Sequence, residues 1–151
     1  MGRDTLIGDA GPNKLVDDLG GGERFIGCGG DDIIYGDGDS QPPQRGDVFD
    51  GGEGTDTVSY SRIYFNRGVV ISLVAGQVTR AAYDRLRSIE NATGGRGEDR
   101  IFGTQWDNVL IGGFRDDVLA GRRGDDTGNG GNGGDGTDTC RGIEAAVSCE
   151  E

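Results

Sequence analysis

Residues 94–129 read GGRGEDRIF GTQWDNVLI GGFRDDVLA GRRGDDTGN, which are four nonapeptides in direct succession. Each follows, with substitutions, the pattern Gly-Gly-x-Gly-x-Asp-x-U-x, in which U is an apolar residue. Outward from this stretch, the same period recurs at residues 8–16, 18–26, 27–35, 51–59 and 133–141. Residues 36–50 form one enlarged turn with six extra residues, and three extra residues, 130–132, precede the last copy. The chain is therefore a repeat protein with a period of nine.

Two positions of the repeat keep their chemistry along the chain. The sixth position carries a side-chain oxygen in every copy, namely in Asp4, Asn13, Glu23, Asp32, Asp47, Asp56, Asp99, Asn108, Asp117, Asp126 and Asp138. The eighth position holds Leu6, Leu15, Phe25, Ile34, Phe49, Val58, Ile101, Leu110, Leu119, Gly128 and Cys140, of which only Gly128 is not apolar. Agreement of two columns over this many turns is more specific than any single motif.

The pattern predicts an all-β fold. Glycines let the backbone turn through positive φ, and the last three letters of each copy form a very short strand. Because neighbouring side chains in a strand point to opposite faces, x-U-x sends one apolar side chain inward and two outward. Two nonapeptides then make one coil, and stacked coils give two parallel sheets with the U side chains between them.

The composition excludes several classes of function. The 151 residues include 32 Gly, 27 acidic and 15 basic residues, giving a net charge of −12 that argues against a nucleic-acid partner. The absence of His removes Ser-His, Cys-His and His-metal chemistry. No apolar run approaches the ~20 residues that span a bilayer, so we expect no membrane insertion. The first residues, Met1 to Asp4, hold no apolar signal core, so we expect either a trimmed fragment or export without an N-terminal signal.

The sixth-position acids predict a need for a cation. Acids on one edge of the stack recur every second turn, about one strand spacing (~4.8 Å) apart. At an effective dielectric near 20, two carboxylates at that distance repel by ~3–4 kcal/mol. Calcium, which takes six to eight oxygen ligands in flexible geometry, suits this edge better than magnesium, and zinc lacks its preferred ligands here. We therefore expect calcium binding and folding to be one event.

The two blocks of repeats, residues 2–59 and 94–141, resemble the RTX, or hemolysin-type, calcium-binding nonapeptide family. The resemblance implies a parallel β-roll, a right-handed β-solenoid, that binds several calcium ions. It also implies how each ion is held. Backbone carbonyls at positions two and four and the side chain at position six of one turn face positions one, three and six of the turn two further on.

Carried onto this chain, the resemblance implies six sites. In the second block they are Gly95, Gly97 and Asp99 with Gly112, Phe114 and Asp117; Thr104, Trp106 and Asn108 with Gly121, Arg123 and Asp126; and Gly113, Arg115 and Asp117 with Gly133, Asp135 and Asp138. In the first block they are Asp9, Gly11 and Asn13 with Gly27, Gly29 and Asp32; Cys28, Gly30 and Asp32 with Gly51, Glu53 and Asp56; and Glu23 with Asp47.

The chain is expected to be one structural domain in three parts. Residues 1–59 form the first repeat block, residues 60–93 are linking strands that continue the roll, and residues 94–151 form the second block with a C-terminal cap. In the linking segment, Val69–Val74 reads as a strand and Ala75-Gly76 as a turn, while Ala81–Leu86 is alternatively a short helix. Asp84 lies outside the repeat, and we expect its replacement to have little effect.

The three cysteines have distinct expected roles. Cys140 occupies an eighth position, and Cys149 lies nine residues on, where the next eighth position falls. A disulfide between them would close the last coil, and secreted proteins favour such bonds; the alternative is two buried thiols. Cys28 falls in a turn and is left single.

These features predict a secreted, bacterial, calcium-binding module without catalysis of its own, unfolded in a low-calcium cytoplasm and folded outside. One alternative is a calcium-dependent carbohydrate-binding module, for which outward arginines provide a cationic surface toward an acidic polysaccharide: Arg62, Arg67, Arg80, Arg85, Arg87, Arg96 and Arg100. Trp106 either covers a turn or stacks on a sugar. Another alternative is the C-terminal secretion or stability domain of a larger secreted hydrolase.

Overall fold

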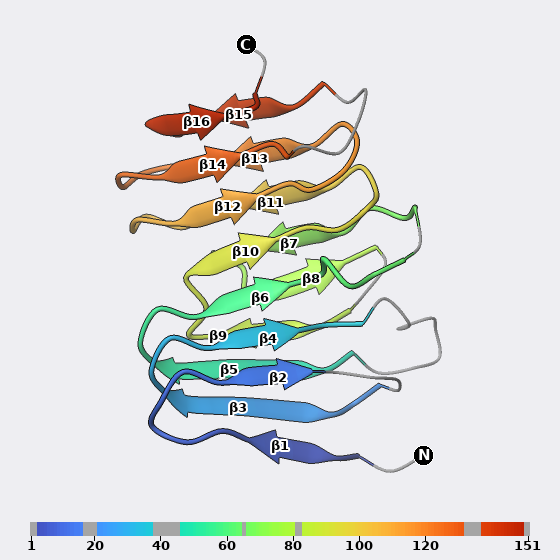
Figure 1. Cartoon of the computed structure of the whole chain (residues 1–151), viewed down its shortest axis with the longest axis vertical. Coiled ribbons are helices and arrows are strands. Elements are labelled where there is room, and N and C mark those ends of the chain that lie inside the picture. The colour runs from blue at the N-terminus through green and yellow to red at the C-terminus, as the bar shows by residue number, and fades with distance from the viewer. Residues whose placement is uncertain are drawn as a thin grey trace.

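The computed structural model describes residues 3–16, 21–37, 46–64, 66–80, 83–131 and 137–149. Throughout these ranges the chain is all-β, contains no helix and winds into a solenoid with two facing sheets (Figure 1). Strand β1 lies at one end of the stack, and β15 and β16 lie at the other. The predicted fold class, a parallel β-roll of stacked Gly-rich turns, is confirmed.

The strands alternate between the two sheets along most of the chain. The nine-stranded sheet contains, in spatial order, β1 (Thr5–Ile7), β3 (Arg24–Gly29), β5 (Val48–Glu53), β9 (Arg85–Arg87), β8 (Gln77–Thr79), β7 (Val70–Ser72), β11 (Arg100–Phe102), β13 (Val118–Ala120) and β15 (Thr139–Arg141). The seven-stranded sheet contains β2 (Lys14–Val16), β4 (Ile33–Tyr35), β6 (Thr57–Ser59), β10 (Asn91–Thr93), β12 (Val109–Ile111), β14 (Thr127–Asn129) and β16 (Ala145–Val147).

The eighth-position side chains form the core, as predicted. Parallel pairing places each of them beside its equivalent in the next coil, for example Ile101 beside Leu119 and Ile34 beside Val58. Whereas Leu6 in the first strand is exposed, eight eighth-position residues are buried: Leu15, Phe25, Ile34, Phe49, Val58, Ile101, Leu110 and Leu119. Four inward residues of the linking strands are buried with them: Ile71, Val78, Leu86 and Ala92. The Phe25 and Phe49 rings pack edge to face at 5.3 Å, in a preferred aromatic geometry.

The linking segment adds strands to one sheet only. The predicted strand at Val69–Val74 is present as β7, and the chain turns at residues 73–76 into β8, which runs antiparallel to β7 and β9. In the opposite sheet β6 pairs directly with β10. Residues 85–87 form strand β9, so the helical alternative for Ala81–Leu86 is wrong where the chain is described. Residues 81 and 82 lie outside the described ranges.

The position of the insertion near residue 130 differs from the prediction. Gly130 takes the first position of its turn, because its N–H donates to the carbonyl of Val147 just as Gly112 donates to Asn129. A Cβ on Gly130 would overlap Oδ2 of Asp138, as expected at a first position. The extra residues therefore follow Gly131. The predicted ligands Gly133 and Asp135 lie outside the described residues.

The predicted disulfide between Cys140 and Cys149 is present, with their Cα atoms 5.8 Å apart. The predicted register of Cys149 is wrong, however, because Ala146 pairs with Gly128 and Cys149 follows the end of β16. Because Gly128 has no side chain, the side chain of Ile143 lies close to its Cα and packs against the core. Cys28 is exposed and free, as expected.

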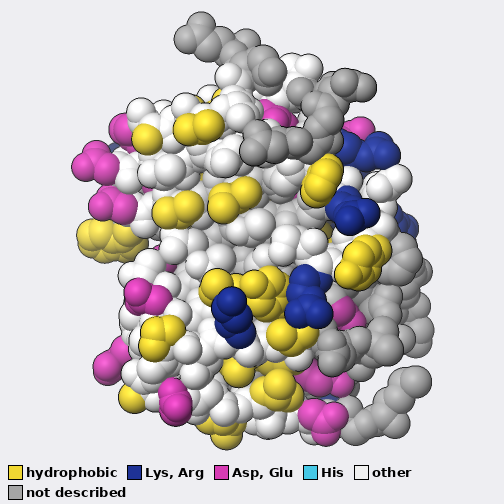
Figure 2. All heavy atoms as spheres, in the orientation of Figure 1, with side chains coloured by type: hydrophobic (Ala, Val, Ile, Leu, Met, Phe, Trp, Pro, Cys, Tyr) yellow, Lys and Arg dark blue, Asp and Glu magenta, His cyan; other side chains and the backbone are white. Residues whose placement is uncertain are grey.

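The outer surface is mostly polar. On the face shown in Figure 2, acidic side chains predominate along the left edge, and basic side chains lie over the middle and right. Among the described residues, no helix has the length and apolar character needed to cross a membrane.

Candidate metal centre

The sixth-position side chains form two rows, one along each edge of the solenoid. We call the row that precedes the nine-stranded sheet the first acid ladder: Glu23, Asp47, Asp84, Asp99, Asp117 and Asp138. The row that precedes the seven-stranded sheet is the second acid ladder: Asn13, Asp32, Asp56, Glu90, Asn108, Asp126 and Glu144. The side-chain members of the predicted sites are thus brought together in adjacent coils.

Most carboxylates in these ladders use one oxygen to hold the preceding coil. Oδ1 of Asp117 accepts a 2.7 Å hydrogen bond from the N–H of Asp99, and Oδ1 of Asp56 accepts one of 2.8 Å from Asp32. The same bond recurs at Asp32, Asp126 and Asp138, whose donors are the backbone N–H groups of Asn13, Asn108 and Asp117. Each of these five acids therefore satisfies a buried backbone donor between coils.

Three ladder members were missed by the sequence analysis. Asp84, Glu90 and Glu144 accept the N–H groups of Asp47, Asp56 and Asp126 at 2.8–2.9 Å. The sequence marks these three acids only by the apolar residue two positions later, which is Leu86, Ala92 or Ala146. No glycine-rich turn precedes any of the three acids. The structure argues against the expectation that replacing Asp84 has little effect, because Asp84 is only 2% exposed and accepts two hydrogen bonds.

The second carboxylate oxygen is buried without a hydrogen-bond partner in the described structure at several ladder positions: Glu23, Asp32, Asp47, Asp56, Asp117 and Asp126. At Asp117 this oxygen lies beside Cα of Gly112, and so does the carbonyl oxygen of Gly130 in the next coil. A Cβ at Gly112 would collide with the Asp117 oxygen, which explains the glycine at position one. The Gly130 carbonyl accepts the N–H of Gly113 at 2.9 Å, whereas the second oxygen of Asp117 has no donor.

The same convergence recurs at other first-position glycines. Gly27 faces Oδ2 of Asp32 and the carbonyl of Gly51, and Gly51 in turn faces Oδ2 of Asp56. Gly121 faces Oδ2 of Asp126. An acceptor buried without a donor is costly, so a proton, a bound water or a cation at each of these positions would stabilise the fold.

Burial and neighbouring acids shift the titration of these groups. Burial, followed by the negative charges of Asp99 and Asp138, raises the pKa of Asp117 to about 8. Burial also raises the pKa of Asp99 to about 6 and that of Asp56 and Asp126 above the ordinary range. The opposite holds at exposed Asp9, where the N–H of Gly11 and the amide of Asn13 lower the carboxyl pKa.

Two kinds of turn distinguish the candidate positions. In four turns the second residue has positive φ and the sixth-position acid keeps an unpaired oxygen; these second residues are Cys28, Gly52, Gly113 and Arg122. Gly131, a fifth second residue, also has positive φ. Where it does not, its N–H donates to the sixth side chain, as from Asp9 to Asn13, from Gly95 to Asp99 and from Thr104 to Asn108. The sixth-position acids of the four turns are Asp32, Asp56, Asp117 and Asp126; Glu23 and Asp47 also carry an unpaired oxygen.

The remaining predicted ligands lie in the outer halves of the turns and offer backbone carbonyls. The carbonyls of Cys28, Gly30 and Gly95 closely approach Gly52, Gly54 and Gly113 of the next coil. The other members of this outer set are Asp9, Gly11, Gly29, Glu53, Gly97, Thr104, Trp106, Phe114, Arg115 and Arg123. Among these, the carbonyl oxygen of Asp9 already accepts a hydrogen bond from the N–H of Gly29, so one of its two lone pairs is occupied.

The donor set is suited to a hard cation. The ladders contain carboxylate and amide oxygens, and the flanking atoms are carbonyl oxygens, which are the ligands of calcium rather than zinc. Within the described ranges no group of three or more Asp, Glu or Cys lies close enough to hold a metal ion. A cation here would thus depend on one or two carboxylates together with carbonyls.

Comparison with known proteins found no matching family model and no matching curated protein. The likeness to RTX repeats therefore rests on the repeat pattern and on the fold.

Proposed function

We propose that this chain is a calcium-binding β-roll module of the RTX kind, which folds when it binds calcium after secretion and has no catalytic role. The observation that carries the proposal is the set of ladder carboxylate oxygens that are buried without a hydrogen-bond donor and lie close to carbonyl oxygens of the next coil. A calcium ion bound there would supply the positive charge that this arrangement lacks.

The residues best suited to hold calcium are Asp32, Asp56, Asp117 and Asp126, together with the carbonyls that lie beside them. Each acid already has one oxygen bonded to the preceding coil and directs the other toward the following coil. Neutralising that second oxygen would remove the repulsion between stacked coils, because the acids on each ladder are neighbours. Calcium would then act on the unfolded chain as a folding ligand.

The proposed extracellular location is supported by the Cys140–Cys149 disulfide, because such bonds persist in oxidising compartments. Extracellular calcium is commonly millimolar, and extracellular modules often bind it with dissociation constants of about 10⁻⁴–10⁻³ M. The same chain would remain unfolded at low calcium.

Far-UV circular dichroism during a calcium titration at pH 8 tests this function, with magnesium titrated in parallel. We expect a coil spectrum in chelator and a cooperative gain of β signal with calcium but not with equal magnesium. Asp117→Ala should shift the calcium midpoint upward, whereas Asp116→Ala, which changes the neighbouring acid, should shift it much less. A complete β spectrum in chelator at this pH would refute the proposal.

A further inference from the structure

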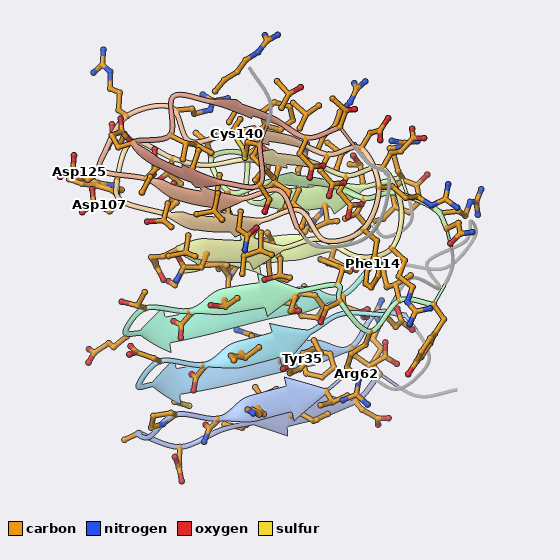
Figure 3. All side chains as sticks on the ribbon, turned by 45° about the horizontal axis from the view of Figure 1, so that its top comes forward. Tyr35, Arg62, Asp107, Phe114, Asp125 and Cys140 are labelled. Atoms are coloured by element: carbon orange, nitrogen blue, oxygen red, sulfur yellow. A yellow bond between two sulfur atoms is a disulfide. The ribbon has the colours of Figure 1, made fainter. Side chains whose placement is uncertain are left out.

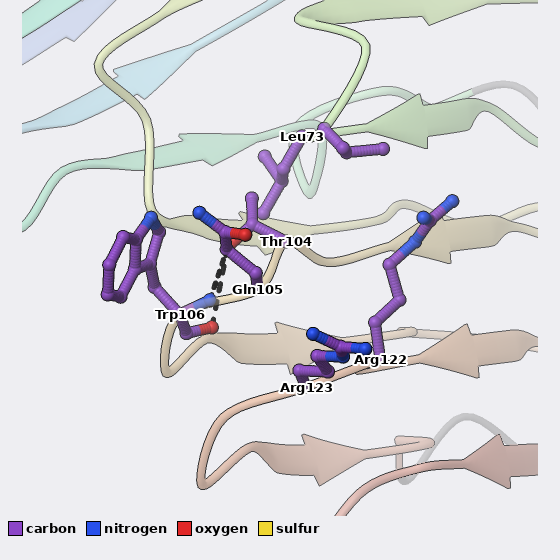
Figure 4. Close-up of a pocket in the computed structure, with 7 residues that line it drawn as sticks. Leu73, Thr104, Gln105, Trp106, Arg122 and Arg123 are labelled. Atoms are coloured by element: carbon purple, nitrogen blue, oxygen red, sulfur yellow. Dashed lines mark hydrogen bonds between the residues drawn. The ribbon is translucent and has the colours of Figure 1, made fainter.

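A cavity of about 570 Å³ lies beside the turn that follows β7, on the edge that carries the second acid ladder. Thr104, Gln105 and Trp106 line it from the turn before β12, and Arg122 and Arg123 line it from the turn before β14 (Figure 4). Val74 of the β7–β8 turn contributes an apolar wall. Three segments of the chain thus meet around one open depression.

Large side chains stand in this cavity where the repeat pattern has glycine. Trp106 occupies the fourth position of its turn, and Arg122 occupies the second position of the next coil. Arg122 has φ of 89°, in the region that favours glycine and strains any residue with a Cβ. Cys28, also at the second position of its turn, has positive φ as well, so this conformation belongs to the repeat, and what distinguishes Arg122 is its large charged side chain.

Trp106 is presented to solvent on a well-fixed turn. Its indole is 69% exposed and projects away from the turn (Figure 4). The turn itself is held because Trp106 N–H donates to Oγ1 of Thr104 at 3.1 Å, and Thr104 N–H donates to Oδ1 of Asn108 at 2.6 Å. Such an indole offers a flat apolar platform and a single N–H donor.

The two guanidinium groups of the cavity are uncommitted. Within the described part of the chain, neither the Arg122 nor the Arg123 guanidinium makes a hydrogen bond or an ion pair, although the protein carries a net charge of −12. A planar guanidinium binds a carboxylate through two parallel hydrogen bonds. The cavity therefore combines a stacking platform with a site for an anion.

Several arginines that the sequence suggested for such a role are already engaged. The Arg96 guanidinium lies 5.4 Å from the ring of Tyr64 and 5.5 Å from that of Phe114. Arg62 lies 5.6 Å from the ring of Tyr35, and Arg80 donates to the carbonyl of Glu98. Tyr35, Arg62 and Phe114 are labelled in Figure 3.

We propose that this cavity binds a saccharide that carries carboxylates, such as a short stretch of a uronic acid polymer. One sugar ring of the polymer would stack on Trp106, the carboxylates of neighbouring sugar residues would pair with Arg122 and Arg123, and the Gln105 amide would hydrogen-bond a hydroxyl. Asp107 and Asp125 lie nearby on the same edge, where Asp107 accepts the N–H of Asp125 (Figure 3). These acids disfavour a densely charged polyanion and suit a ligand that is rich in hydroxyl donors.

Trp106 is the single Trp of the chain, so its fluorescence reports the site directly. The experiment titrates calcium-folded protein with tri-galacturonate, with its fully methyl-esterified form, and with a tri-glutamate peptide, and it repeats each titration by calorimetry. We expect saturable binding of tri-galacturonate, and binding at least about tenfold weaker for the ester, the size of one lost charge-assisted hydrogen bond. Equal binding of the ester or of the peptide would overturn the assigned ligand class.

Arg122→Gly provides a variant that should fold at least as well, because glycine suits this φ. We expect Arg122→Gly and Arg123→Ala each to weaken tri-galacturonate binding about tenfold, and Trp106→Ala to abolish it by calorimetry. Arg96→Ala, outside the cavity, should bind as the parent does. Because circular dichroism verifies folding separately, unchanged affinity in Arg122→Gly and Arg123→Ala, or no binding by folded protein, would refute this site without bearing on calcium.

Discussion

The hydroxyl of Tyr60 donates a 2.5 Å hydrogen bond to Oδ2 of Asp84, and both side chains are buried in the linking coil. Oδ1 of Asp84 accepts the N–H of Asp47 at 2.8 Å, so this carboxylate joins the linking segment to the first repeat block. Burial raises the pKa of Tyr60 well above its ordinary value and that of Asp84 to about 7.

Tyr60→Phe should therefore destabilise the folded module by about 1–3 kcal/mol, because it leaves one oxygen of a buried carboxyl group without its donor. Denaturant unfolding in saturating calcium measures the change. Tyr64→Phe is the matched control, since Tyr64 is 77% exposed, and it should cost nothing measurable. Equal stability of the two variants would contradict the role assigned to the Tyr60–Asp84 bond.

Asp117→Asn should have opposite effects on the metal-free and calcium-bound forms. The oxygen of the Asn amide still accepts the N–H of Asp99. Its NH₂ group lies near the carbonyl of Gly130 and can donate there, which a carboxylate cannot do. We expect the metal-free form to gain about 1–2 kcal/mol at pH 8 and the calcium midpoint to rise. The β signal in chelator at about pH 6.5, where the parent should be partly folded, and the calcium midpoint at pH 8 measure the two effects. A β signal in chelator below that of the parent would contradict the argument.

Without divalent cations, stability should fall as the pH rises. The folded pKa values of Asp99, Asp84 and Asp117, about 6, 7 and 8, exceed the unfolded value near 4. Folded protein therefore binds more protons, and the stability from these groups is full below about pH 4 and is lost as the pH rises through 6 to 8. The far-UV β signal in chelator at pH 5, 6.5 and 8 tests this trend, which should end in the coil spectrum expected at pH 8.

Calcium should flatten that pH dependence, because it replaces the protons and releases them on binding. Melting temperatures in saturating calcium at the same pH values provide the comparison. A β signal that rises with pH in chelator would show that the pKa shifts have the wrong sign.

Reduction of the Cys140–Cys149 bond should loosen the last coil. A nine-residue loop is expected to contribute about 2–3 kcal/mol in the chain-entropy model. Hydrogen exchange in β15 and β16 of Cys149→Ala should accelerate, while β4 and β6 remain protected, since coils contact mainly their neighbours. Cys28→Ser serves as control, and uniform acceleration across all strands would contradict a local effect.

The repeat made much of this fold predictable, because the Asp-x-U spacing fixes both the strand and its inward residue, as at Asp117 and Leu119. It failed where glycine turns no longer mark the period. Asp84 and Glu90 precede their strands at the right distance, but only the pairing of β9 with β5 and of β10 with β6 shows that they belong to the ladders.

The nine-residue spacing also gave a wrong register for the C-terminal coil, after the insertion. Counting nine residues from Cys140 placed Cys149 in the core, whereas hydrogen bonding between coils puts Ala146 beside Gly128. The division of the turns by the φ angle of the second residue was likewise beyond the sequence, since Cys28 and Arg122 adopt a conformation usually reserved for glycine.

The linking segment has a consequence for the order of assembly. Val69 stands before β7 where other coils carry an acid, and its N–H is held by Asp99. On that side the row of charges is split into two shorter rows, while the opposite side continues through β6 and β10. Each half of the solenoid would therefore be able to fold separately as soon as it leaves the cell. The continuous seven-stranded sheet of the folded half would then provide the edge strand with which the other half pairs.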